Sequence, residues 1–252
     1  MDTQQVKVNY LLHLADTNLI LSHRLAQWCG IAPELEIDMA LANIGLDLLG
    51  EARNLYQYIA ELEGKNKSED DYAYLREERE YKNLLLVERP NEGFDQSIAR
   101  QFLYDSFHSL LLQELVNSND AQLSAIAQKS LKEVSYHLRY SSGWVIRLGD
   151  GTQVSHTKMQ AALNDLWRYT DEMFEPSDEE RALAELGVIA DVASLKEQWR
   201  SNVQAVLDKA TLTLPESAYA QHGGKGGQHS EYLGFILAEL QYMQRTYPNQ
   251  QW

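Results

Sequence analysis

Apolar residues recur at helical spacing along most of the chain, most clearly between Glu34 and Gly64. The steps between apolar positions there alternate between four and three, so these side chains lie along one stripe of a long helix. The stripe consists of Ile37, Leu41, Ile44, Leu48, Leu55, Tyr58 and Leu62. Glu51 occupies the stripe position between Leu48 and Leu55. A carboxylate at such a position is costly unless it is paired, hydrogen-bonded or bound to a metal.

The same periodicity predicts three further long helices, over about residues 3–29, 96–117 and 120–148. Gly30 is expected to end the first of them, and Asp120 to cap the last. A short helix is predicted over 71–79. The following segment, 80–93, is predicted to be irregular because it contains Pro90 and Gly93. We expect its apolar run 84–87 to pack onto the core.

The last hundred residues predict shorter helices. Ser155 is expected to begin one, and the capping boxes Ser177-x-x-Glu180 and Ser194-x-x-Glu197 to begin two more. A loop over 211–227 precedes a last helix over 230–247. No segment has the pattern of a strand or a repeat. The sequence therefore predicts an all-α chain that forms a single domain over 1–252, with a four-helix core in 1–150 and a helical C-terminal extension in 151–252.

Composition narrows the possible partners. The net charge of −15 argues against binding to nucleic acid or to an acidic membrane surface. The single Cys29 excludes an internal disulfide framework and fits a reducing compartment. No apolar run reaches the length of a membrane span, and the first ten residues lack the layout of a signal peptide. We expect a cytoplasmic protein.

Three of the four long helices carry a polar residue inside the apolar stripe, namely Glu51, Asp105 and His137. Ser22 or His23 could supply the fourth, from the first helix. One inward-facing polar residue per helix is typical of metal sites in four-helix bundles. Ferritin-like di-iron proteins use a Glu from each of two helices and Glu-x-x-His from each of the other two.

This chain lacks most of those ligands. Val134 stands three residues before His137, and Leu48 stands three residues before Glu51. An apolar side chain cannot ligate iron, so the remaining donors are too few for two iron ions. We therefore expect no catalytic residue and no bound metal, and instead a buried ion pair or hydrogen-bond network among Glu51, Asp105 and His137.

The glycine-rich stretch 223–227 resembles a phosphate-binding loop only superficially, because the P-loop spacing and a preceding strand are missing. We expect a flexible loop at the surface or at an interface there. His222 and His229, which flank the stretch, are expected to be exposed.

Several long blocks are similar to the C subunits of bacterial phenylacetyl-CoA epoxidases, which are multicomponent ring monooxygenases of aerobic phenylacetate breakdown. The blocks are LILSHRLAQWCGIAPELEIDMALANIGLDLLGEARN, REEREYKNLLLVERPN, KEVSYHLRYSSGWVIRLGDGT and GGKGGQHSEYLGFILAELQYMQRTYPNQQW. The resemblance spans nearly the whole chain. It implies a ferritin-like fold and a non-catalytic role in association with the A subunits of these enzymes, which are catalytic and carry the di-iron centre.

The resemblance also assigns positions. The D-E-x-G-H motif of the catalytic relative lines up with residues 47–51 here, and its E-S-F-H motif lines up with residues 134–137. This implies a decayed metal site at Leu48, Glu51, Asp105, Val134, His137 and His23. It further implies that the chain stabilises the catalytic di-iron partner, contacts other subunits or the reductase, and helps to frame the site for phenylacetyl-CoA. The substrate-contact candidates are Glu80, Tyr81, Lys82, Asn83, Arg181, Ala182 and Leu183.

Two other functions fit the residues and stay open at this point. One is an independent metalloenzyme with an atypical site at Glu51, Asp105, His137 and His23. The other is a homo-oligomeric helical scaffold outside any oxygenase.

Overall fold

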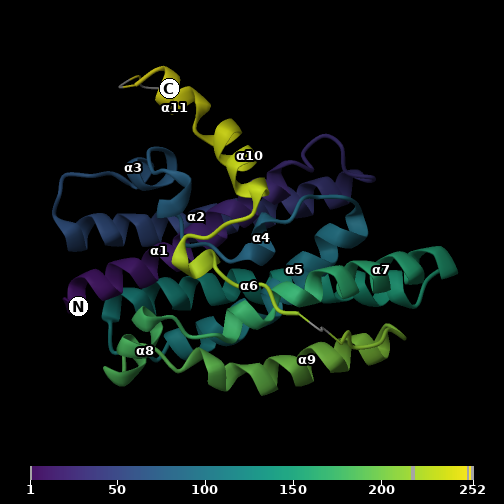
Figure 1. The fold of residues 1–252 in the computed structure, drawn as a ribbon. Helices are drawn as coiled ribbons and strands as arrows, with labels where there is room; N and C mark the ends of the chain where they lie inside the picture. The colour runs from purple at the N-terminus through teal and green to yellow at the C-terminus, as the bar shows by residue number, and fades with distance from the viewer. Residues whose placement is uncertain (1, 217–218, 249, 251–252) are drawn as a thin grey trace. The chain divides into compact units, whose positions relative to one another are not determined.

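The computed structural model describes residues 2–216, 219–248 and 250, and every regular element in these ranges is a helix (Figure 1). The predicted all-α class is therefore confirmed. Within the described residues no helix is both long enough and apolar enough to cross a membrane. The chain divides into two compact units, Met1–Glu88 with Gly223–Trp252, and Arg89–His222. This division differs from the predicted core and extension, and the prediction of a single domain stays a prediction.

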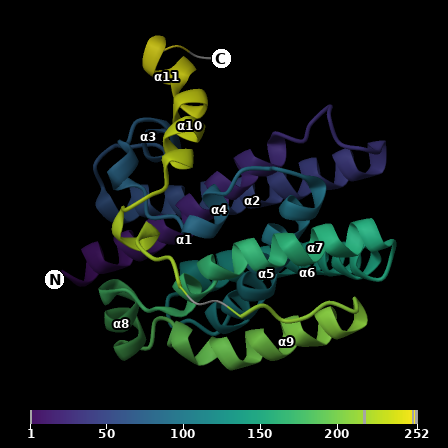
Figure 2. The ribbon, with the colours of Figure 1, turned by 45° about the vertical axis from the view of Figure 1, so that its right-hand side comes forward.

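The first unit is organised around two long helices, α1 (Thr3–Ala26) and α2 (Leu35–Glu63), which pack side by side (Figures 1 and 2). The predicted stripe of α2 is buried from Ile37 to Tyr58, Glu51 included, which confirms its periodicity. Gly64 ends α2 in a left-handed conformation with φ of 60°. By contrast, α1 is buried on all sides along much of its length. It ends at Ala26, and turns lead from there through Gly30.

Short helices and turns complete the first unit. They are α3 (Glu69–Tyr74), the 3₁₀ turn η1 (Glu78–Glu80), α4 (Leu85–Glu88), η5 (Gly224–Gly226), α10 (Glu231–Leu240) and α11 (Tyr242–Thr246). The helix predicted over 71–79 is thus α3 followed by a separate turn. The segment 80–93 is not wholly irregular, because one helical turn, α4, forms in its apolar run. Leu84, Leu85, Leu86 and Val87 are buried, so the expected packing of that run is confirmed.

The second unit is built on two long helices, α5 (Phe94–Leu115) and α6 (Ala121–Gly149). Its other elements are α7 (Gln153–Leu166), α8 (Asp178–Glu185), α9 (Lys196–Lys209) and the 3₁₀ turns η2 (Trp167–Tyr169), η3 (Asp171–Phe174) and η4 (Val192–Leu195). Asp120 caps α6 by accepting from the Leu123 backbone N–H at 3.0 Å, as predicted. Each unit therefore holds one pair of long helices, the elements of which a ferritin-like bundle is made.

Three predicted helix boundaries are wrong. The helix expected to begin at Ser155 begins at Gln153, because Thr152 is its N-cap and Ser155 is the third helical residue. The box expected at Ser194 does not form, since Asp191 caps the turn η4 and η4 continues directly into α9. The expected last helix breaks at Gln241 into α10 and α11. The predicted box Ser177-x-x-Glu180 is present.

Candidate functional site

The polar cluster that the stripes predict in the second unit is centred on Asp105. This residue lies in α5 with none of its surface exposed. Its carboxylate accepts hydrogen bonds from Ser141 Oγ of α6 at 2.8 Å and from Gln101 Nε2 at 2.7 Å. His137 is buried as well, on the same stripe of α6 as Ser141. A hydrogen-bond network is therefore present around Asp105, with Ser141 and Gln101 as its members. That Glu51 and His137 join Asp105 in one network stays a prediction.

Burial dominates the electrostatics of this cluster. It raises the pKa of Asp105 to about 6, although His137, Ser141, Gln101 and His108 all act in the opposite direction. Desolvation therefore outweighs the combined effect of the neighbouring histidines and hydrogen bonds on the pKa of Asp105. A carboxyl group with such a pKa changes its charge easily near neutral pH.

The other predicted metal-site positions do not complete a ligand set. Leu48 and Val134 are fully buried apolar side chains, so both sites of expected carboxylates are filled by hydrocarbon. Glu51 is buried on α2. His23 instead lines an apolar groove between α1 and α2, where burial lowers its pKa.

Nowhere in the described part of the chain do three or more His, Cys, Asp or Glu side chains gather closely enough to hold a metal ion. A di-iron centre needs six such ligands. The residues present at the aligned positions therefore do not fit a di-iron centre. That this chain binds no metal stays a prediction.

The first group of substrate-contact candidates, residues 80–83, is held firmly within the first unit. The Lys82 backbone N–H donates to Asp16 Oδ2 at 2.8 Å, and the Lys82 carbonyl lies 2.7 Å from His13 Nδ1. The side chains of Tyr81 and Asn83 are fully buried. Glu80 is exposed and Lys82 is half-buried, so these two side chains are the ones that can reach a ligand.

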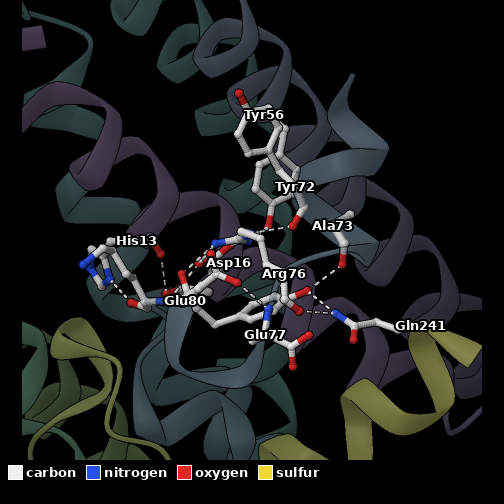
Figure 3. A network of polar contacts seen from close by, with 12 residues as sticks. His13, Asp16, Tyr56, Tyr72, Ala73, Arg76, Glu77, Glu80 and Gln241 are labelled. Carbon is white, nitrogen blue, oxygen red and sulfur yellow. Dashed lines mark hydrogen bonds and ion pairs between the residues drawn. The ribbon is translucent and has the colours of Figure 1, made fainter. Parts of the chain in front are cut away.

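A buried ion pair fixes this segment to α1. Asp16 is fully buried and accepts from both terminal nitrogens of the Arg76 guanidinium, and also from Tyr56 Oη at 2.5 Å (Figure 3). Burial disfavours the Arg76 charge, but Asp16 more than offsets it and raises the pKa of Arg76. Burial and the nearby Asp16 likewise raise the pKa of Tyr56 well above its ordinary value.

Asp16 and Arg76, which lie sixty residues apart in the chain, were not predicted from the sequence. One signal was available. His13, Asp16 and Thr17 are spaced three and four residues apart, so they share one face of α1, although the neighbouring positions are mostly apolar.

A second buried pair attaches the C-terminal segment to the same region. His229 Nδ1 lies 2.6 Å from Glu88 Oε1, and His229 Nε2 lies 2.8 Å from the Tyr81 carbonyl oxygen. Neither side chain of this pair has any exposed surface. Both ring nitrogens face acceptors, so the doubly protonated imidazolium satisfies both contacts. The hydrogen bond to Glu88 raises the pKa of His229 against the effect of burial.

The expectations for the glycine-rich stretch were therefore partly wrong. His229 is buried in a charge pair rather than exposed, whereas His222 is exposed as predicted. The stretch itself is packed against the chain: Gly224 and Gly227 are buried, and a Cβ atom at either would collide with the backbone carbonyls of Asn83 and Arg79, respectively. A polar cavity of about 550 Å³ lies beside it, lined by Glu78, Arg79, Gly226, Gly227, Gln228 and His229.

The second group of substrate-contact candidates lies on α8 in the other unit. Arg181 is exposed, and its Nη2 lies 3.2 Å from Asp178 Oδ1. Ala182 is half-buried and Leu183 is fully buried. Arg181 is therefore the member of this group whose side chain is open to a ligand.

The helices and the incomplete ligand set together define a ferritin-like helical protein without the ligands of a di-iron centre. The chain belongs to the phenylacetic acid catabolic protein family, whose sequence profile matches residues 1–252. It is 52% identical over 243 residues to the C subunit of 1,2-phenylacetyl-CoA epoxidase from Escherichia coli (strain K12), and the match covers 96% of this chain and 98% of that relative.

Proposed function

We propose that this chain is a non-catalytic subunit of a phenylacetyl-CoA epoxidase and that its partner there is the catalytic subunit, which holds the di-iron centre. The end-to-end match to the C subunit of such an enzyme supports membership of the complex. The observation that carries the non-catalytic role is the replacement of metal ligands by buried Leu48 and Val134. The single Cys29 and the absence of a spanning helix among the described residues support a place in the cytoplasm.

The role that remains for the chain is structural. Its buried pairs, Asp16 with Arg76 and Glu88 with His229, hold the segment 77–88 in one conformation. Breaking a buried pair by removing one partner typically costs about 3–5 kcal/mol, so this conformation is strongly specified. A rigid helical subunit of this kind can stabilise a partner subunit that packs against it.

The test is reconstitution with separately purified subunits of the same organism. Epoxide formation from phenylacetyl-CoA is measured with the reductase present, for this chain by itself, for the catalytic subunit by itself and for the mixture. We expect no turnover from this chain by itself and full turnover from the mixture. Turnover by this chain without the catalytic subunit would overturn the proposal.

We further propose that Lys82 contacts the CoA ester within the complex and, as a separate proposal for the other unit, that Arg181 does. Both are cationic side chains with exposed surface in the two candidate segments, and a CoA ester carries phosphates. Lys82→Ala and Arg181→Ala should raise KM for phenylacetyl-CoA with kcat little changed. Lys129→Ala, an exposed lysine of α6, is the matched control. An unchanged KM in both variants would remove these residues from the substrate site.

A further inference from the structure

Helix α2 carries a second apolar stripe that the protein does not bury. Leu35, Met39, Leu46 and Leu49 are 70%, 57%, 64% and 39% exposed, and Ile31, just before the helix, is 73% exposed. The helical positions again follow steps of four and three once the half-buried Ala42 is included. Residues two apart on a helix point about 200° away from each other, so this outer stripe lies opposite the buried stripe of Ile37, Leu41 and Ile44.

The outer stripe continues into a groove on α1. A groove of about 240 Å³ lies between α1 and α2 and is lined by Ser22, His23, Ala26, Cys29, Ala42, Gly45, Leu46 and Leu49. Leu46 and Leu49 thus belong to both features. A Cβ atom at Gly45 would lie 3.4 Å from the Ser22 carbonyl oxygen, so the helices approach closely at the floor of the groove. The apolar surface therefore extends from one helix of the pair to the other.

The charges that flank the outer stripe are acidic over most of its length. They are Glu34, Glu36, Asp38 and Asp47, and the first basic residue after Arg24 is Arg53, which lies beside Leu49 at the C-terminal end of the stripe. Glu34 and Glu36 are exposed. A partner surface that covers the apolar centre would therefore meet an acidic border, and electrostatic complementarity requires basic residues around its own apolar face.

Isolated exposed apolar side chains are common, but a continuous row is not. From Leu35 to Leu49 the outer stripe extends about 21 Å along the helix, which is the length of a helix–helix contact. The four-three spacing is the one by which two helices interdigitate their side chains. A second copy of this chain is a poor occupant, because each copy carries a net charge of −15 and the same acidic border.

We propose that the outer stripe, with the adjoining groove, is the docking surface for a helical protein partner whose apolar face is bordered by Lys and Arg. This inference rests on the proposed function, which identifies that partner as the catalytic subunit of the same complex. The partner covers Leu35, Met39, Leu46 and Leu49, and its basic border faces Glu34 and Glu36.

The test measures the affinity between this chain and the purified catalytic subunit. The double variant Met39→Ser/Leu46→Ser should weaken binding by at least about tenfold, because apolar side chains at the centre of an interface dominate its affinity. The matched control is Val154→Ser/Leu186→Ser, two residues of the other unit that are 67% and 52% exposed. Circular dichroism should show the same helix content and the same unfolding temperature for both double variants.

Charge reversal tests the chemistry of the partner. Glu34→Lys/Glu36→Lys should weaken binding most at low salt and flatten its dependence on salt concentration, because it removes attraction to a basic border. The control is Glu185→Lys, at an exposed glutamate of α8, which should change neither the affinity nor its dependence on salt concentration.

The outcomes separate the two proposals. If the unmodified chain binds and Met39→Ser/Leu46→Ser binds equally well, the docking surface is wrong while the proposed function stands. If even the unmodified chain shows no binding to the catalytic subunit, both are wrong. If light scattering shows that the unmodified chain self-associates and the double variant does not, the occupant is a second copy and the inference is overturned.

Discussion

The carboxyl group of Asp105 is buried, and burial disfavours its charged form. Because its pKa is raised to about 6, the folded protein holds a proton there at pH values at which the unfolded chain has released it. The unfolded state binds fewer protons in this range, so the free energy of unfolding falls as the pH rises from about 4 to about 6.

The variant Asp105→Asn should remove this dependence. Between pH 5 and pH 7.5 the unmodified protein should lose about 1 kcal/mol of unfolding free energy relative to the variant. Urea unfolding at the two pH values measures it. The control is Asp150→Asn, at an exposed position, and its unfolding free energy should change with pH as that of the unmodified protein does. Parallel pH profiles for Asp105→Asn as well would show that Asp105 does not titrate in this range.

His229 contributes with the opposite sign. Its pKa is raised because the charged ring is hydrogen-bonded to Glu88, which outweighs the effect of burial. The stabilisation from this charge is fully present below about pH 6.5, the pKa of an unperturbed His, and it is lost as the pH rises through the higher pKa of the folded protein.

We expect His229→Gln to lower the unfolding free energy by about 3 kcal/mol at pH 6, because it leaves the buried charge of Glu88 without its cationic partner. The loss should shrink as the pH is raised to 9. His222→Gln, on the same loop but exposed, should have little effect at either pH. A loss that is equally large at both pH values would mean that the ring stabilises by shape and neutral hydrogen bonding rather than by charge.

At the scale of elements, the C-terminal helices α10 and α11 depend on a turn that only glycine can form. Gly224 lies against the backbone of Asn83 and Leu85, with no room for a Cβ atom. Gly226, two residues on, has nothing within 4 Å of such an atom. The two positions offer a matched pair, because both are glycines in the same turn η5.

Gly224→Ala should therefore destabilise the protein by about 2 kcal/mol or more, in the range for overpacking a tight contact, and release the C-terminal segment. Gly226→Ala should be close to neutral. Hydrogen exchange read at α10 shows the release directly, and we expect faster exchange there in Gly224→Ala alone. Equal exchange in both variants would contradict the contact between Gly224 and Asn83.

The long helices were predicted to within a few residues because their periodicity extends over many turns. The short elements were predicted less well for particular reasons. Ser194 and Glu197 form a correct capping pattern, but Asp191 begins the turn first. The break between α10 and α11 at Gln241 could not be predicted from the neighbouring sequence. The Gln241 side chain donates to the Arg76 carbonyl and to Tyr81 Oη, both of which are more than 150 residues away in sequence.

The same limit applies to the site. Asp105 and His137 were predicted because each interrupts an apolar stripe, which is a local signal. Asp16 and Glu88 were missed because their partners, Arg76 and His229, are 60 and 141 residues away. A buried charge is recognisable from sequence when it interrupts an apolar stripe. Asp16 stands beside the apolar stripe of α1 rather than within it, and Glu88 stands in a segment too short to show a stripe.

At the scale of the whole molecule, metal content decides which role this chain plays in the complex. Leu48 and Val134 offer no donor atom, and no three ligating side chains gather among the described residues. Affinity for iron falls steeply as carboxylate and imidazole ligands are lost. The chain purified alone should therefore contain well below one equivalent of iron or any other transition metal per polypeptide, by elemental analysis.

The control is the catalytic subunit, expressed and purified in the same way, which should contain close to two irons. Substoichiometric metal in this chain with a loaded catalytic subunit would place the oxygen chemistry in the partner. About one tightly bound metal per chain would favour the independent metalloenzyme with an atypical site. Near two irons per chain would mean that ligands outside the aligned positions complete a centre, and that this chain activates oxygen itself.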